Sequence, residues 1–126
     1  MNKFDLEERL INFAVSIVEI DNSMTKTRAG AHLGNQLLRS GTSPALNYGE
    51  AQSGESRKDF IHKIKIVLKE LRETMVCLKI IQRTKLVHNQ DQIIWLMKEN
   101  NELISIFVKS VETALKNSDE ESTKKK

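Results

Sequence analysis

Polar side chains recur along residues 36–50 at the spacing of one helix face, and they are the residues of this chain that could do chemistry. Successive members are four, three, four and three residues apart. With Arg39 and nearby acids they could form a polar groove that holds a general acid or base, or a closed hydrogen-bond network between two helices. We expect the network, because no histidine, nucleophilic cysteine or metal cluster joins the set. The stripe consists of Gln36, Ser40, Ser43, Asn47 and Glu50.

A helical hairpin that turns near residues 54–55 would decide which side chains the stripe meets. Facing residues are then about equally far from the turn, so Arg39 lies opposite Glu70. By the same count Gln36 faces Glu73, and Lys63 lies near Asn47 and Glu50. A guanidinium that faces carboxylates between packed helices forms charge-assisted pairs, which fix the register of the two helices.

The stripe runs through the chain's only proline, Pro44, and residues 39–56 around it hold three of the five glycines. An interior proline usually ends a helix, so two short helices with a loop at residues 41–44 are one alternative. The polar spacing continues through the proline, which favours one helix over 27–53. We expect that helix to be kinked near 40–44, because Pro44 lacks a backbone donor and crowds the carbonyl of Ser40.

Apolar residues at helical spacing mark three further segments, over about 5–21, 57–84 and 90–116. The predicted N-cap residues are Asp5, Ser56 and Asp91, and Trp95 is expected in the core. Together these segments predict an all-α fold, an antiparallel up-down-up-down four-helix bundle over residues 1–117. Residues 118–126 are polar and charged, which predicts a disordered tail.

Composition narrows the class of protein. The 126 residues suffice for one domain, and no apolar run reaches the roughly 20 residues that span a bilayer. Acids near the N-terminus, where a signal peptide would be basic and then apolar, predict a cytoplasmic protein with no membrane partner. The single cysteine excludes an intrachain disulfide and a cysteine-based zinc site. The three histidines stand on separate segments, and no phosphate-binding glycine motif is present, so we expect no metal, cofactor or small-molecule substrate.

Charge is unevenly distributed along the chain. The net charge is +3, yet residues 1–25 hold two basic and five acidic residues, and residues 56–85 hold nine basic and three acidic ones. Six cations follow one flank of the third helix over about 35 Å, at 1.5 Å per residue. We call them the basic row: Lys58, Lys65, Lys69, Arg72, Lys79 and Arg83.

The basic row admits two interpretations. Such a row can follow an RNA phosphate backbone, without base-specific readout since no aromatic residue stands in it. It can instead form salt bridges with the acid-rich first helix of a neighbouring subunit. Three apolar residues of the same helix lie away from its core face and predict contacts with another subunit: Ile66, Cys77 and Ile80.

The stretch "QLLRSGTSPALNYGEAQSGESRKDFIHKIKIVLKELRET", residues 36–74, resembles the signature of a bacterial four-helix-bundle family. The family includes proteins encoded in intervening sequences of 23S ribosomal RNA genes. The segments "LEERLINFAVSIVEI" and "NELISIFVKSVETALKN" fit its first and last helices. The chain departs from the family at Gly49 and Gly54, where alanine is common, and at residues 76–77, where aromatics are common.

The resemblance implies a compact antiparallel bundle that forms a homo-oligomer, because family members form pentameric rings. It implies no established enzymatic activity. It also points to association with nucleic acid, from the genomic setting and from the related accessory proteins of diversity-generating retroelements.

We therefore expect a non-enzymatic oligomeric interaction protein that associates with RNA through the basic row. The alternative is a scaffold ring that binds a protein partner and uses the basic row in salt bridges between subunits. An enzyme would instead need an open pocket with perturbed carboxylates around Arg39 and Glu70.

Overall fold

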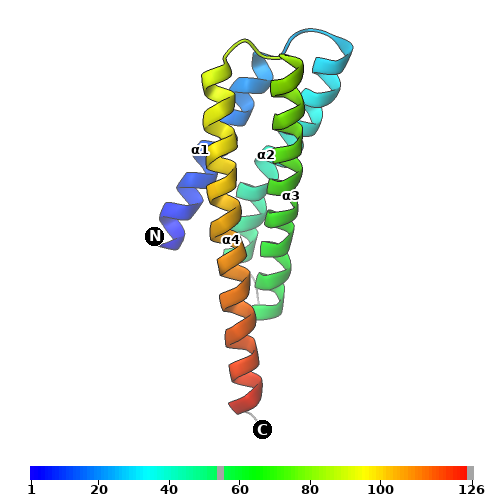
Figure 1. Ribbon diagram of the computed structural model, residues 1–126. Helices are drawn as coiled ribbons and strands as arrows, with labels where there is room; N and C mark the ends of the chain where they lie inside the picture. Colours follow the sequence, from blue (N-terminus) through cyan, green and yellow to red (C-terminus); the bar gives the residue numbers. More distant parts are fainter. Residues whose placement is uncertain (54–55, 125–126) are drawn as a thin grey trace.

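Four helices make up the computed structural model, which describes residues 1–53 and 56–124 and side chains as far as residue 118. They are α1 (Lys3–Asn22), α2 (Arg28–Gln52), α3 (Arg57–Thr84) and α4 (Gln90–Lys124). Successive helices run in opposite directions (Figure 1). The described residues contain no strand, so the predicted all-α four-helix bundle is confirmed. The turn predicted at residues 54–55 lies outside the described residues.

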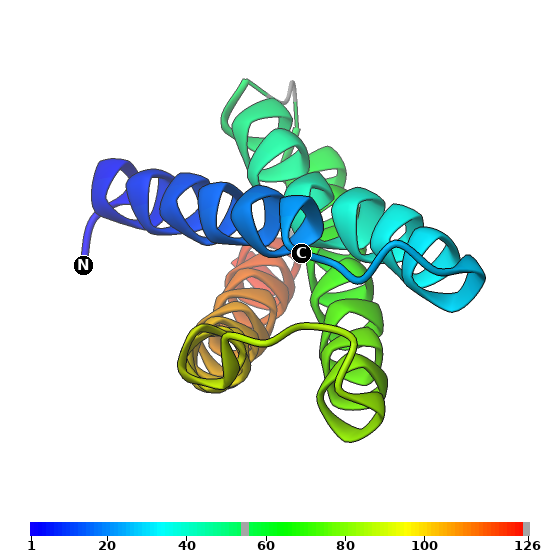
Figure 2. The same ribbon diagram turned by 90° about the horizontal axis from the view of Figure 1, so that it is seen from above.

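The helices pack as a four-sided bundle. Contacts join α1 to α2, α2 to α3, α3 to α4 and α1 to α4, and neither diagonal pair of described helices is in close backbone contact. The α1–α2 edge therefore lies opposite the α3–α4 edge, as the view from above shows (Figure 2). Both interhelix loops at one end meet through Thr25, whose backbone nitrogen and hydroxyl donate to the Leu86 carbonyl at 2.8 and 2.7 Å. We call this the Thr25 end.

The core fills the space between the four apolar stripes. Phe13 and Ile17 from α1, Leu37 from α2 and Phe107 from α4 are fully buried there. Tyr48 of α2 meets Phe107 edge-on, with ring centroids 5.6 Å apart. Burial of these side chains provides the main driving force for packing the helices.

Helix α2 continues through Pro44 from Arg28 to Gln52, so the two-helix alternative is wrong. Side chains bond to carbonyls on either side of the proline. Thr42 donates to the Leu38 carbonyl at 2.7 Å, and the Asn47 amide donates to the Ser43 carbonyl at 3.0 Å. The bend near 40–44 stays a prediction.

Gly41 lets α1 and α2 approach closely. A Cβ placed on it would lie 2.7–2.8 Å from three side-chain carbons of Ile17, which is fully buried. Such distances are below van der Waals contact, so only glycine fits here without displacing Ile17.

The helix ends differ from the predicted ones in their caps. Ser56 caps α3 as predicted, with its hydroxyl accepting from the Asp59 nitrogen at 3.1 Å. Asn2, not Asp5, caps α1, and it accepts from two backbone nitrogens. At α4 the Asn89 side chain, rather than Asp91, accepts a first-turn nitrogen at 3.1 Å. Asn and Asp cap equally well, so composition alone does not choose between neighbouring candidates.

Helix α4 is longer than the sequence predicted. It continues to Lys124, past the expected end near 116, and so through most of the segment predicted as a disordered tail. Helical hydrogen bonds are internal to the segment, and Glu and Lys are good helix formers, so the backbone can continue without tertiary contacts. Residues 125–126 lie outside the described residues.

Trp95 is not a core residue. It lies 46% exposed on α4, whereas its neighbours Ile93 and Leu96 are fully buried. Two residues of helix turn a side chain by about 200°, so Trp95 faces away from the side that buries Ile93.

Candidate functional site

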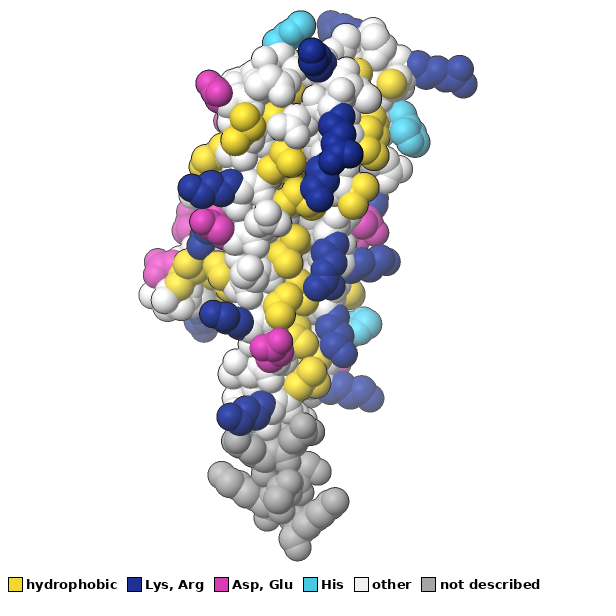
Figure 3. Space-filling view, viewed as in Figure 1, with side chains coloured by type: hydrophobic (Ala, Val, Ile, Leu, Met, Phe, Trp, Pro, Cys, Tyr) yellow, Lys and Arg dark blue, Asp and Glu magenta, His cyan; other side chains and the backbone are white. Residues whose placement is uncertain are grey.

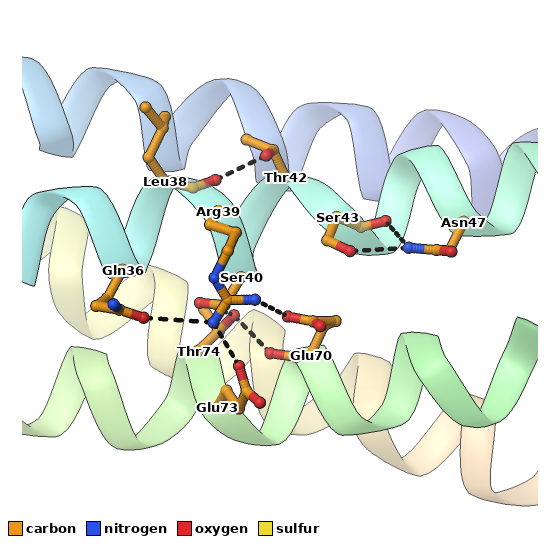
Figure 4. A network of polar contacts seen from close by, with 10 residues as sticks. All are labelled: Gln36, Leu38, Arg39, Ser40, Thr42, Ser43, Asn47, Glu70, Glu73 and Thr74. Atoms are coloured by element: carbon orange, nitrogen blue, oxygen red, sulfur yellow. Dashed lines mark hydrogen bonds and ion pairs between the residues drawn. The ribbon is translucent and has the colours of Figure 1, made fainter.

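Arg39 forms the centre of a polar cluster between α2 and α3 (Figure 4). Its guanidinium donates to Glu70 at 3.0 Å and to Glu73 at 2.8 Å. It also donates to the Gln36 amide oxygen at 3.3 Å, and this bond helps to orient the guanidinium. The predicted facing of Arg39 and Glu70 is thus present within a single chain.

Behind this cluster lies a buried hydroxyl pair that sequence reasoning missed. The Thr74 hydroxyl is hydrogen-bonded to the Ser40 hydroxyl at 3.0 Å and to the Glu70 carbonyl at 2.8 Å. Ser40 therefore bonds across to α3. Thr74 stands four residues after Glu70 on the same side of α3, a spacing that could have identified it.

The rest of the stripe does not join the Arg39 cluster. Glu50 pairs with Lys63 at the other end of the α2–α3 interface, as predicted. Asn47 does not reach Lys63 in any hydrogen bond between described residues, and its amide is instead 2.8 Å from the Ser43 hydroxyl on its own helix. The stripe therefore forms three separate groups, of which two bond across to α3 and the Ser43–Asn47 group bonds within α2.

The electrostatics of the Arg39 cluster suit ion pairing. The Glu70 side chain is 11% exposed and that of Arg39 53%. The hydrogen bond from Arg39, with further attraction from Arg39 and Lys69, holds the pKa of Glu73 below its ordinary value. A general base for neutral pH needs the opposite shift. The lowered pKa of Glu73 therefore fits its pairing with the Arg39 cation.

A shallow groove runs over this cluster and along α3. It has a volume of about 990 Å³ and is open to solvent. Apolar side chains of α3 form much of it, and Val111 of α4 contributes at one side. We call it the α3 groove, and the residues that matter below are Lys65, Lys69, Arg72, Val76 and Ile80.

All six cations of the basic row are exposed. Figure 3 shows Lys and Arg side chains along α3, beside a column of apolar side chains between α3 and α4. Among the described residues no salt bridge joins any of the six to an acid. The acids of α1 lie on a helix that makes no close contact with α3 within the chain.

The three residues predicted to contact another subunit differ in their exposure to solvent. Ile80 is exposed and Ile66 is half-buried. Cys77 is not a surface residue, because it is only 7% exposed and its sulfur lies 3.5 Å from the Leu33 carbonyl of α2. Burial also raises the pKa of the Cys77 thiol, which favours the unreactive protonated form.

Two exposed apolar features were not predicted. Val76 of α3 is 58% exposed next to the buried Cys77. On α1, Ile11, Val15 and Val18 are exposed beside Leu46 of α2, around a groove of about 350 Å³.

The described residues offer no metal site, since no three of their His, Cys, Asp or Glu side chains come together to hold an ion. None of the helices, over the residues searched, is long and apolar enough to cross a membrane.

Comparison with known proteins agrees with the bundle and its α2–α3 signature. The 23S rRNA-intervening sequence protein family matches residues 2–109. The chain belongs to this family. It is also similar to a crystal structure of a protein of unknown function from the S23 ribosomal protein family of Bacteroides thetaiotaomicron. That chain is 30% identical, the match covers 84% of this chain and 97% of that one, and the TM-score is 0.77. No curated protein matches this chain significantly.

Proposed function

We propose that this member of the 23S rRNA-intervening sequence protein family is a cytoplasmic, non-enzymatic interaction protein that assembles as a homo-oligomer and binds RNA phosphates through its basic row. The observation that carries the proposal is the row itself. Six exposed cations follow one line on α3 without a salt bridge to any described acid. Cations without a salt bridge to a described acid are available to a polyanion.

The geometry of the row suits a nucleic-acid backbone rather than bases. Lys58 and Arg83 are separated by about 38 Å of helix, at 1.5 Å per residue. Side chains along such a line can meet successive phosphates, whereas base readout would need stacking or groove-inserting groups that the row lacks. Assembly of several chains would multiply the row, and avidity rises with the number of simultaneous contacts.

The non-enzymatic part of the proposal is supported by the polar cluster. Its acids are paired with Arg39, and the pKa of Glu73 is shifted away from the range of a general base. The groove above it is open to solvent, unlike a site that excludes water from a reaction.

A salt series of RNA titrations tests the RNA part. We expect the affinity for RNA to fall steeply as the salt concentration rises. In the triple variant with Lys58, Lys65 and Lys69 changed to Ala, the slope of log affinity against log salt concentration should be shallower by about 2, at roughly 0.7 per lost single-strand phosphate contact. The matched control changes three exposed lysines outside α3 to Ala and should keep the wild-type slope: Lys3, Lys26 and Lys98. Equal loss in both variants, or no RNA binding by wild type, would refute a specific role for the row.

A protein scaffold is the second candidate, and one observation favours it. Val76 and Ile80 stand exposed beside the cations, and apolar side chains gain more from a protein surface than from phosphates.

A further inference from the structure

Two exposed apolar side chains interrupt the basic row. Val76 is 58% exposed and Ile80 is 42% exposed, and we call them the α3 apolar pair. Arg72 stands four residues before Val76 and Lys79 three residues after it, so both cations share its side of α3. The row therefore has a gap of about 10.5 Å between Arg72 and Lys79, at 1.5 Å per residue, and Val76 lies in that gap.

The α3 apolar pair belongs to a larger surface that also carries cations. The α3 groove joins the pair to the apolar side chains of Leu33 on α2 and Val111 on α4. Glu73 is the acid that lines this groove, and its carboxylate accepts a hydrogen bond from Arg39 at 2.8 Å. The groove therefore presents an apolar surface beside three cations that have no salt bridge to a described acid: Lys65, Lys69 and Arg72.

A nucleic acid that suits this surface must offer apolar groups as well as phosphates. In a duplex the base faces are stacked inside, and the outside presents phosphates and sugars. A duplex on the α3 groove would bring phosphates against Val76 and Ile80, which removes water from the phosphates without a hydrogen bond in return. Unpaired bases expose flat, largely apolar faces. These faces can cover the pair while the phosphates on either side meet cations.

The shape of the basic row also favours an unpaired strand. The row runs along one continuous helix, whereas each strand of a duplex winds around the duplex axis. A straight row therefore meets the phosphates of a duplex strand over only part of a turn. A single strand is flexible and can lie extended along the whole row.

We propose that the α3 groove binds unpaired RNA, with phosphates at Lys69, Arg72 and Lys79 and base faces on the α3 apolar pair. This deepens the RNA part of the proposed function, on which it rests, by naming the form of RNA. Contact with base faces needs no hydrogen bond to base edges, so binding should tolerate changes of sequence. Val76 and Ile80 then determine the preference for unpaired over paired RNA, and the cations determine the salt dependence.

Three RNA probes of equal length test the proposal by fluorescence anisotropy with the full chain at one salt concentration. They are oligouridylate as the single strand, an analogue whose sugars carry no bases, and an RNA duplex. Wild type should bind oligouridylate about tenfold more tightly than either of the others, because this probe alone offers phosphates together with exposed base faces. Charge alone would favour the duplex, since it carries more phosphates over the same length.

A double variant separates the apolar contribution from that of the cations. Val76→Ser with Ile80→Ser keeps all six cations of the basic row, so its salt slope with the base-free analogue should equal that of wild type. Its preference for oligouridylate over the base-free analogue should fall from about tenfold to less than about twofold. The matched control, Ile94→Ser with Leu115→Ser, changes two exposed apolar residues of α4 and should keep the wild-type preference. Circular dichroism should show the wild-type helix content for both variants, because all four side chains are exposed.

The possible failures are distinguishable. A wild type that binds the three probes equally tightly, or the duplex most tightly, would overturn the inference and leave the basic row as a phosphate contact alone. A double variant that keeps the preference would overturn it as well, because the base faces then lie elsewhere and the α3 apolar pair is left for a protein partner. A wild type that binds no probe refutes the RNA proposal itself, and this inference with it.

Discussion

Gly41 and Gly49 are a matched pair for measuring how closely α1 packs on α2. Both lie inside α2, so replacing either by Ala should gain about 0.5–1 kcal/mol from helix propensity. Nothing lies within 4 Å of a Cβ at Gly49, and that variant should keep the whole gain. At Gly41 the new Cβ would lie 2.7–2.8 Å from three carbons of the fully buried Ile17. Overpacking of this kind costs about 1–3 kcal/mol.

The difference between the two variants isolates the steric part, since the propensity gain is common to both. We expect Gly49→Ala to be more stable than Gly41→Ala by about 1–3 kcal/mol, or roughly 3–5 °C in Tm per kcal/mol for a domain of this size. Thermal and urea unfolding at one fixed protein concentration would measure it, because assembly makes Tm depend on concentration. If Gly41→Ala proves as stable as Gly49→Ala, the close approach at Ile17 is not a constraint on the fold.

Three further predictions concern single side chains. Both polar atoms of the Asn100 side chain are buried without a hydrogen-bond partner among the described residues, so Asn100→Leu should raise the free energy of unfolding by about 1–2 kcal/mol. The control Asn101→Leu, at an exposed position, should change the free energy of unfolding by less than about 0.5 kcal/mol. A lower free energy of unfolding for Asn100→Leu than for wild type would contradict this prediction. Because Arg39 holds the folded-state pKa of Glu73 below 4.5, this ion pair stabilises the fold above that pH and is lost as pH falls through the lowered pKa. Arg39→Ala should therefore lose less stability than wild type when urea unfolding is repeated from neutral pH to below 4.5. Cys77, buried with a raised thiol pKa, should react with a thiol reagent far more slowly in the folded chain than in urea, and equal rates would show an accessible thiol.

The α2–α3 hairpin was predictable because a short turn fixes register. Once residues 54–55 are taken as the turn, equal counting brings Arg39 to Glu70, and the structure has that pair at 3.0 Å. The spacing of the polar stripe also predicted a continuous helix through Pro44. Both predictions depend on the spacing of residues along one helix or across one turn, and that spacing can be counted in the sequence.

The burial of individual side chains on α3 was not predictable in the same way. Cys77 was expected on the surface and is buried, while its neighbour Val76 is exposed. Which of two adjacent residues is covered depends on how far α2 rotates around α3 and how closely it approaches. The packing of α2 against its other neighbours also affects that approach, so the spacing of residues along α3 alone does not predict it.

Helix α1 carries a second apolar row besides its core face. Leu6, Leu10, Phe13, Ile17 and Ile20 already provide one complete buried face. Ile11, Val15 and Val18 form a second apolar row on the same 20-residue helix. A helix at the corner of a four-sided bundle packs its inward face on its neighbours and leaves its outward face to solvent. A second apolar row on that outward face, bordered by the exposed carboxylates of Glu8 and Glu19, therefore marks α1 as more than a helix that only covers the core.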